Sequence, residues 1–456
     1  MELTAAHLAE LTGGVVVGDP TVVVSAFAID SRVLDPGSAF VALTAARDGH
    51  DFVVDAFAAG AVVALVAREV ATPAGATLVV VDDPLAALGR VAAGVHPADR
   101  RVVGITGSAG KTATKDLTAA ALAGALRVHA SPGSFNNEAG FPLTLLGAPD
   151  ATQVVVAEMG ARFPGNIADL CAVARPEIGV ITHIGLSHAE HLGGRAGIAR
   201  TKGELVEALP ATGYAVLNAD DDTTPSLADR TSAAVVTVGV SPTADVVVRD
   251  IVLDGGLRPT FTIESPWGAT AVTLGLRGAH QAHNAAMAVT VALLLGVPID
   301  VAVADLGSAT SADWRMDLVE APGGVVVLND AYNASPSSMH ASLRAFATLP
   351  ARGRHVAVVG DMLELGECGE AEHAEVGALA AELGVDVVIA VGPASAATAT
   401  AASAGGAEVH HVADRDEART VVAAIVEPGD AVLVKASRLV GLEVVADALV
   451  RGEAVA

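Results

Sequence analysis

The sequence is poor in cysteine. Its two cysteines, Cys171 and Cys368, stand far apart, and neither belongs to a Cys-x-x-Cys pair or to a cluster of cysteine and histidine. A disulfide framework or a thiolate zinc site needs several such residues at short spacing, so neither is supported. We therefore expect a protein of a reducing compartment, and the cytoplasm fits best.

Basic residues are also scarce. The chain has 27 lysines and arginines against 52 aspartates and glutamates, which gives a formal net charge of −25. A field of this sign repels polyanions, which argues against a general nucleic-acid or membrane-surface binder. Any phosphate that the protein binds must therefore be held by a local group of donors.

Aromatic residues make up only 3% of the chain, whereas hydrophobic residues make up 52%. The core is therefore expected to consist mainly of alanine, valine and leucine in a globular chain. The longest apolar helical run, residues 285–297, is too short to cross a bilayer, and the first residues lack the basic stretch of a secretory signal. We expect no stable membrane insertion and interpret the run as a core helix.

The length of 456 residues predicts about three domains. Residues 1–97 alternate valine-rich runs with helical patterns and predict a small N-terminal α/β domain. Apolar strands recur at βαβ spacing in residues 98–312, which predicts a central domain with a parallel sheet, and again in residues 313–456, which predicts a Rossmann-like C-terminal domain. Residues 246–273 predict an antiparallel hairpin. The strands expected in the second and third domains are 102–105, 154–157, 178–181, 215–217, 325–328, 356–359, 387–391 and 432–434.

The most informative segment is Gly-Ile-Thr-Gly-Ser-Ala-Gly-Lys-Thr at residues 104–112, which follows an apolar run and opens an alanine-rich helical pattern. This context predicts a phosphate-binding loop. Gly107 and Gly110 let backbone N–H groups turn toward an anion, Lys111 supplies positive charge, and the Thr112 hydroxyl can ligate Mg²⁺. An ordinary glycine-rich turn is the alternative for so short a motif.

Reactive side chains gather where the expected strands end. Ligands of parallel α/β sheets bind beyond the carboxyl ends of the strands, so polar residues there predict a site rather than packing. The set comprises Thr106, Glu158, Thr182, His188, Asn218, Asp220, Asp330, Asp361 and Lys435.

Several of these segments resemble the Mur ligase family. The first group is Asn-Asn-Glu-Ala-Gly-Phe-Pro at 136–142, Glu-Met-Gly at 158–160, His188, and Lys-Gly-Glu-Leu at 202–205. A second group looks like the members that add D-alanyl-D-alanine: Asp-Ala-Tyr-Asn-Ala-Ser-Pro-Ser-Ser-Met at 330–339, Gly-Asp-Met-Leu-Glu-Leu-Gly at 360–366, and Lys-Ala-Ser-Arg at 435–438. The likeness runs in a consistent order through nearly the whole chain.

The resemblance implies an ATP-dependent ligase that joins D-alanyl-D-alanine to a UDP-N-acetylmuramoyl tripeptide in peptidoglycan precursor synthesis. The tripeptide carboxylate would take the γ-phosphoryl group, the dipeptide amine would attack the acyl phosphate, and ADP and phosphate would leave. This chemistry needs positioned charge rather than a protein nucleophile. The expected cofactors are ATP and two Mg²⁺ ions, the expected partners are the two substrates without nucleic acid, and the expected state is a monomer.

The resemblance also implies roles for individual residues. Catalysis would depend on Lys111, Glu158, His188 and Lys202. ATP would be held by Gly107, Ser108, Ala109, Gly110, Lys111, Thr112, Asn284, Arg315 and Asp330. The Mg²⁺ ligands would be Thr112, Glu158, His188 and a carbamate formed on Lys202 with CO₂. The substrates would contact Ser31, Arg32, Asn136, Asn137, Glu138, Tyr332, Asn333, Lys435, Ser437 and Arg438, with Asp48 and His50 in motifs that accompany UDP binding.

Carbamylation of Lys202 has a physical reason, because an unmodified ammonium about 4 Å from Mg²⁺ would be repelled by roughly 8 kcal/mol at an effective dielectric of about 20. Plainer roles compete with the implied ones. Glu158 could be a solvated carboxylate at a strand end, Lys202 a surface lysine paired with Glu204 or Glu207, and Asn284 a helix N-cap.

The sequence departs from the family pattern at three places: Gln281 stands where asparagine is common, and Trp314 and Ala436 replace glycines that are common there. Three other functions stay open. A Mur ligase that adds diaminopimelate or lysine typically carries Asp-Asn-Pro-Arg, which is absent here. A small-molecule kinase would share the phosphate loop, and a nucleotide-gated scaffold would share the fold without catalysis.

Overall fold

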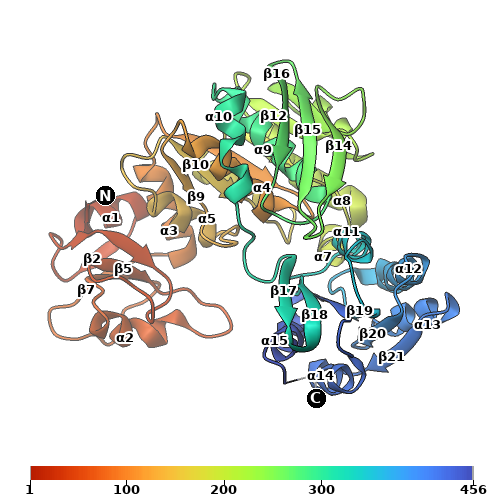
Figure 1. The fold of residues 1–456 in the computed structure, drawn as a ribbon. Helices are drawn as coiled ribbons and strands as arrows, with labels where there is room; N and C mark the ends of the chain where they lie inside the picture. The colour runs from red at the N-terminus through yellow and green to blue at the C-terminus, as the bar shows by residue number, and fades with distance from the viewer. Residues whose placement is uncertain (1, 454–456) are drawn as a thin grey trace.

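The computed structural model describes residues 2–453, and its chain forms three α/β units that each have their own main sheet. The central unit lies between the N-terminal unit, drawn in red and orange, and the C-terminal unit, drawn in blue (Figure 1). None of the helices in residues 2–453 is both long and apolar enough to cross a membrane. The α/β class with three domains, expected from the sequence, is confirmed.

The N-terminal unit is built on a five-stranded sheet in the order β2-β7-β6-β5-β4. β2 runs antiparallel to β7, and the other neighbours are parallel. Asp83 starts the last helix of the unit by accepting the Leu85 N–H at 2.8 Å, and Pro84 fills the first helical position. The elements are β1 (Leu3–Thr4), α1 (Ala5–Thr12), β2 (Val15–Val17), β3 (Val23–Val24), β4 (Ala26–Ala28), β5 (Ser38–Val41), α2 (Val53–Ala58), β6 (Val63–Val66), β7 (Thr77–Val80) and α3 (Pro84–Val95).

The central unit contains a nine-stranded sheet in the order β16-β15-β14-β13-β12-β11-β8-β10-β9. Its strands are β8 (Arg101–Thr106), β9 (Val128–Ala130), β10 (Val154–Glu158), β11 (Ile178–Ile181), β12 (Tyr214–Asn218), β13 (Ala234–Gly239), β14 (Val246–Leu253), β15 (Pro259–Ser265) and β16 (Gly268–Thr273). Its helices are α4 (Lys111–Ala123), α5 (Gly140–Leu146), α6 (Asn166–Val173), α7 (Ala189–Leu192), α8 (Gly194–Glu207), α9 (His280–Leu294) and α10 (Ile299–Ala304).

Strand β8 shows how the central sheet is buried on both faces. Val103 and Ile105 pack in the cluster that contains residues of α4 and α9, whereas Val102 faces the opposite cluster with residues of α3, α5 and α6. The second cluster also includes side chains of the N-terminal sheet, so one apolar core joins these two units. The run 285–297, expected as a core helix, lies mostly in α9, which is buried along nearly its whole length.

The antiparallel hairpin expected at residues 246–273 is a three-stranded antiparallel meander of β14, β15 and β16. The expectation missed one strand because the segment contains two turns. The first turn is closed by Asp254, which accepts the Arg258 N–H at 2.8 Å, and the second by Ser265, which donates to the Gly268 carbonyl at 2.8 Å.

The C-terminal unit has a six-stranded sheet in the order β17-β18-β22-β19-β20-β21, parallel except for β17. Apolar clusters cover both of its faces, as expected for a Rossmann-like sheet. The elements are β17 (Asp317–Ala321), β18 (Val325–Asn329), α11 (Pro336–Ala347), β19 (His355–Gly360), α12 (Gly369–Glu382), β20 (Val387–Val391), α13 (Ala396–Ala404), β21 (Glu408–Val412), α14 (Arg415–Ile425), β22 (Ala431–Lys435) and α15 (Glu443–Val450).

Candidate active site

The glycine-rich loop connects the end of β8 to the start of α4. Gly110 caps α4 with φ at +81°, and a Cβ there would lie 2.7 Å from the Asn284 Oδ1. A Cβ on Gly107 would lie 1.9 Å from the Thr182 Oγ1, so neither position has room for a side chain. The Lys111 Nζ donates to the Gly107 carbonyl at 3.0 Å. The loop therefore presents the N-terminus of a 13-residue helix and one lysine to the same point, as an anion site requires.

Glu158 ends strand β10 beside this loop, and its side chain is almost fully buried. One carboxylate oxygen accepts the Thr112 hydroxyl at 2.8 Å, and the other accepts the Asn136 amide at 2.7 Å. The alternative of a solvated carboxylate is therefore wrong. These two hydrogen bonds hold the Glu158 carboxylate at the phosphate loop, where it can bind a cation.

Lys202 lies on α8 and is only 2% exposed. The two glutamates considered as its partners are engaged elsewhere: Glu204 accepts the Gly165 N–H at 2.8 Å, and Glu207 pairs with Arg230 at 2.8 Å. The alternative of a surface lysine is therefore wrong. Burial, followed by the positive charge of Lys111, lowers the pKa of Lys202 well below its usual value, which favours the neutral amine.

His188 caps the short helix α7 with φ at +59° and is partly buried. Its Nδ1 atom contacts the carboxylate of Glu364, which comes from the C-terminal unit. Burial lowers the pKa of His188, the Glu364 carboxylate opposes that change, and the charges of Lys111 and Lys202 add to it. Because Lys111 belongs to the phosphate loop, His188 lies in the electrostatic environment of that loop.

The C-terminal unit reaches the phosphate loop through Arg315. Its Nη2 donates to the Thr112 hydroxyl at 3.1 Å, and its guanidinium carbon lies 3.9 Å from the centre of the Tyr332 ring. The Tyr332 hydroxyl in turn donates to the Ser134 Oγ of the central unit at 2.8 Å. Two units therefore contribute to one polar site.

Asp330 and Lys435 form a buried ion pair at the carboxyl ends of β18 and β22. The Lys435 Nζ lies 2.5 Å from the Asp330 Oδ2 and also donates to the Asn333 carbonyl at 2.9 Å. The same carboxylate accepts the Met316 N–H at 3.0 Å and the Ser342 hydroxyl at 2.5 Å. Asp330 and Lys435 therefore bind each other, and Asp330 also holds the loop of Arg315 through the N–H of the next residue, Met316.

Asn284 lies on the second turn of α9, because that helix begins at His280. The alternative of a helix N-cap is therefore wrong. Its Nδ2 donates to the Gln281 Oε1 at 2.9 Å, and its Oδ1 faces Gly110 of the phosphate loop. The residue thus lies at the helix end of that loop.

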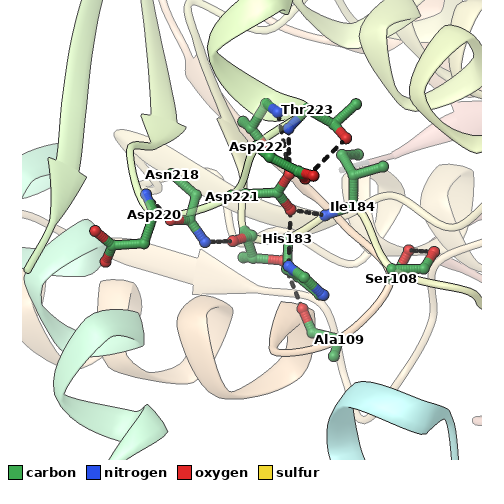
Figure 2. Close-up of polar contacts among 12 residues, drawn as sticks. Ser108, Ala109, His183, Ile184, Asn218, Asp220, Asp221, Asp222 and Thr223 are labelled. Atoms are coloured by element: carbon green, nitrogen blue, oxygen red, sulfur yellow. Dashed lines mark hydrogen bonds and ion pairs between the residues drawn. The ribbon is translucent and has the colours of Figure 1, made fainter. Parts of the chain in front are cut away.

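A second group of polar residues lies next to the phosphate loop and holds it in place (Figure 2). Asp221 accepts the Ile184 N–H at 2.7 Å and the Thr223 N–H at 2.8 Å, and it pairs with the His183 Nδ1 at 2.8 Å. Burial alone would raise the pKa of Asp221, but these donors together hold it below its usual value. The His183 carbonyl accepts the Ser108 N–H at 2.8 Å, so the group fixes the phosphate loop.

The remaining expected substrate residues are mostly at the surface. Arg32 is 76% exposed and pairs with Asp30 at 2.6 Å in the N-terminal unit, next to the half-buried Ser31. Asn137 and Glu138 are exposed before α5. The N-terminal unit, which carries Ser31 and Arg32, lies on the other side of the central unit from the C-terminal unit, so these two residues do not join the C-terminal group (Figure 1). Asn137 and Glu138 belong to the central unit.

Two expected substrate residues of the last loop have partners within the C-terminal unit. The Ser437 Oγ accepts the Leu363 N–H at 2.9 Å. Arg438 lies 4.6 Å from the centre of a ring of Trp314 and pairs with Glu443 at 2.8 Å.

His50, by contrast, is nearly buried. Its Nε2 accepts the Ala67 N–H at 2.8 Å and its Nδ1 contacts Asp48, so the ring braces the N-terminal unit.

Sequence reasoning missed two residues that organise the site. Lys115 is buried and donates to the Ser131 carbonyl at 2.6 Å and the Gly133 carbonyl at 3.1 Å, which fixes the loop that carries Asn136. The sequence does contain one sign of this role, because Lys115 lies one helical turn after Lys111 and therefore on the same side of α4. The second residue, Glu364, belongs to the segment 360–366 that resembles the family, but the sequence of that segment does not indicate that its side chain contacts the central unit.

The donors present fit a magnesium ion. In residues 2–453 no group of three or more histidine, cysteine, aspartate or glutamate side chains could hold a metal by itself. Mg²⁺ in nucleotide sites usually takes only one or two protein ligands and completes its shell with phosphate and water. The Thr112 hydroxyl and the Glu158 carboxylate form such a pair of oxygen donors at the phosphate loop.

The central α/β domain supplies a phosphate loop, and an arginine of the Rossmann-like domain binds to it. This arrangement is typical of nucleotide-dependent ligases with several domains. The sequence profile of the Mur ligase middle domain matches residues 105–292, and that of the Mur ligase glutamate ligase domain matches residues 314–438. The chain belongs to the Mur ligase family, and it is a ligase. The family prediction made from the sequence is confirmed.

The relatives agree along the whole chain. It is 41% identical to the UDP-N-acetylmuramoyl-tripeptide--D-alanyl-D-alanine ligase of Mycobacterium tuberculosis, over 99% of this chain and 98% of that protein. Identity with the Bacillus subtilis enzyme of the same name is 35%, over 96% of each chain. Among solved structures, a crystal structure of MurF from Acinetobacter baumannii matches with a TM-score of 0.89, 30% identity and 99% of both chains covered. The MurF ligase of Thermotoga maritima in complex with ADP matches with a TM-score of 0.80 and 30% identity, over 93% of this chain and 97% of that one.

Proposed function

We propose that this chain is the ATP-dependent ligase that joins D-alanyl-D-alanine to UDP-N-acetylmuramoyl tripeptide, with release of ADP and phosphate. The observation that carries the proposal is the hydrogen bond from Arg315 of the C-terminal unit to Thr112 of the phosphate loop. This contact brings a second domain to the phosphate site. A ligase needs one there, because its acyl phosphate must be shielded from water until the amine arrives.

The residues at the loop suit phosphoryl transfer to a carboxylate. The N–H groups of residues 107–110 and the Lys111 ammonium would hold the β- and γ-phosphates of ATP. Arg315 would balance charge on the transferred group from the opposite side. Magnesium, held by Thr112 and Glu158 at the nucleotide, would supply further neutralisation of the phosphate oxygens.

Lys202 is proposed to carry a carbamate. Carbamylation joins a neutral amine to CO₂ and releases one proton, and the lowered pKa of Lys202 favours that neutral amine. The product places a negative charge near Lys111, where an ammonium would be repelled. With His188 it would provide the ligands of a second magnesium ion.

We also propose the assignment of the outer residues and the domain limits. The N-terminal domain, residues 1–97, would bind the UDP end of the substrate near Ser31 and Arg32. Its limit is placed before β8, which is the first strand of the central sheet in chain order among residues 2–453. The loops after β18 and β22, with Tyr332, Asn333, Ser437 and Arg438, would border the peptides, and the central and C-terminal domains would meet between residues 312 and 313. The enzyme would act as a cytoplasmic monomer.

The test is product formation with ATP, Mg²⁺, the UDP-linked tripeptide and D-alanyl-D-alanine, with each acceptor omitted in turn. A ligase releases phosphate only when both acceptors are present and makes the UDP-linked pentapeptide. A phosphorylated product without the dipeptide would indicate a kinase, and nucleotide binding without turnover would indicate a scaffold. Lys111→Ala is expected to abolish turnover, and normal turnover in that variant would contradict the assignment of the loop.

A further inference from the structure

The segment after β19 forms a rigid arm of the C-terminal unit, defined here as residues 361–366. The Asp361 carboxylate accepts the Ser395 N–H at 2.8 Å, and the Asp361 carbonyl accepts the Ser437 N–H at 3.1 Å. The Met362 N–H donates to the His373 Nε2 at 2.9 Å. Since each anchor belongs to the same unit, the arm moves with the C-terminal unit and not with the central one.

Within residues 2–453, the carboxylate of Glu364 at the tip of this arm forms its ion pairs with residues of the central unit. It lies 2.6 Å from the Arg162 Nη2, contacts the His188 Nδ1 with its second oxygen, and lies 3.7 Å from the His191 Nε2. Its own carbonyl accepts the Glu190 N–H at 3.1 Å. A single acidic residue therefore meets four residues of the other unit.

The backbone at this tip is in a conformation that few non-glycine residues adopt. Glu364 has φ at +61°, and the following Gly366 packs with its ideal Cβ position 3.4 Å from Glu190. A left-handed backbone is strained for a residue other than glycine, so contacts elsewhere must stabilise it. Here the contacts that do so lie across the interface.

We propose that Glu364 is a positioning residue that turns the His188 imidazole toward the phosphate site, and does so only when the C-terminal unit is docked. The inference rests on the proposed function. An imidazole has two ring nitrogens, and a carboxylate that accepts the Nδ1 proton leaves Nε2 as the free lone pair. Carboxylates in this position fix the orientation and tautomer of metal-binding histidines and raise their basicity.

The charges around the pair agree with this role. Arg162 and His191 face Glu364 from the central unit, while Lys111 and Lys202 act on His188 from the phosphate side. With Nδ1 in contact with the Glu364 carboxylate, Nε2 is the ring nitrogen that is left for another ligand. Because Glu364 belongs to the other unit, opening of the domains would release the imidazole.

The experiment compares Glu364→Ala, Glu364→Gln, Arg162→Ala and the matched control Glu367→Ala, whose glutamate is exposed three residues further on. Binding of Mn²⁺ as the probe ion in the presence of ADP is measured by electron paramagnetic resonance, and the radius of gyration by small-angle X-ray scattering. We expect Glu364→Ala to weaken binding of the second Mn²⁺ ion, the one assigned to His188, by about tenfold or more, the usual effect of losing such a partner, and to leave the ion at Thr112 and Glu158 unchanged. Glu364→Gln, whose amide oxygen can still accept the Nδ1 proton, should lose less, and Glu367→Ala should match the wild type.

Arg162→Ala separates positioning from simple docking, because it removes an interface contact without touching His188. It should leave the units docked, with a radius of gyration near that of the wild type, because Glu364 keeps its contacts with His188 and Glu190, and it should keep Mn²⁺ affinity closer to the wild type than Glu364→Ala does. Unchanged Mn²⁺ affinity in Glu364→Ala, or equal losses in Arg162→Ala and Glu364→Ala, would overturn the inference. A wild-type protein that binds Mn²⁺ with ADP but makes no pentapeptide would instead count against the proposed function.

Discussion

Removing Lys435 should destabilise the C-terminal unit far more than removing a lysine or arginine at the surface. The Lys435 and Asp330 side chains are 3% and 11% exposed, and their charged atoms lie 2.5 Å apart. Lys435→Ala would leave the Asp330 carboxylate buried with two neutral donors, from Met316 and Ser342. Breaking a buried pair in this way costs about 3–5 kcal/mol, because one charge stays without compensation.

The assay follows urea unfolding by tryptophan fluorescence. The chain has two tryptophans, and Trp267→Phe leaves Trp314 as the reporter of the C-terminal unit, which avoids treating three units as one two-state system. With an m value of about 2 kcal/mol/M, a loss of about 4 kcal/mol lowers the midpoint by about 2 M. The control is Arg451→Ala, since Arg451 and Glu453 are 57% and 52% exposed and such a pair contributes about 0–1 kcal/mol.

The double variant Lys435→Met with Asp330→Asn completes the test. It removes both charges, so it should recover part of the loss seen in Lys435→Ala. If Lys435→Ala unfolds at the same urea concentration as Arg451→Ala, the pair is not buried as described and the reasoning fails.

Three further predictions concern the central unit and the thiols. Lys202→Ala should be nearly inactive in the pentapeptide assay and partly rescued by small carboxylates that occupy the place of the carbamate; full activity without them would exclude a role at the metal. Lys115→Met loses two hydrogen bonds from a charged donor, at about 1.5–3 kcal/mol each, and an ion pair with Asp116; it should destabilise the central unit and speed amide hydrogen exchange at residues 131–133, whereas unchanged exchange would contradict its role. Burial raises the pKa of the Cys171 thiol to about 12, so near neutral pH iodoacetamide should label the exposed Cys368 alone in the native protein, and mass spectrometry showing equal labelling of Cys171 would refute this.

Buried strands were the part of the fold that sequence predicted best. Residues 178–181 and 387–391 form β11 and β20 with the expected limits, because short continuous apolar runs rich in β-branched residues are typical of strands buried on both faces. The strands β17 and β21 were not predicted, since both lie at sheet edges and mix exposed polar residues with apolar ones.

The candidate site was predictable only where local sequence determines geometry. The glycines at 107 and 110 identify the loop in the sequence, although contacts with Thr182, His183 and Asn284 also hold its shape. The pairing of Asp330 with Lys435 depends on β18 lying beside β22, although the residues are far apart in sequence. The contact of Glu364 with His188 depends on how two units dock, and no residue pattern within either unit encodes that.

The transfer of oxygen tests the central claim most directly. The UDP-linked tripeptide is prepared with ¹⁸O in its terminal carboxylate and turned over with ATP and D-alanyl-D-alanine, and the released phosphate is analysed by mass spectrometry. An acyl phosphate at the loop of Lys111 predicts one ¹⁸O atom in each phosphate released with the pentapeptide. Unlabelled phosphate, with pentapeptide formed, would contradict the account.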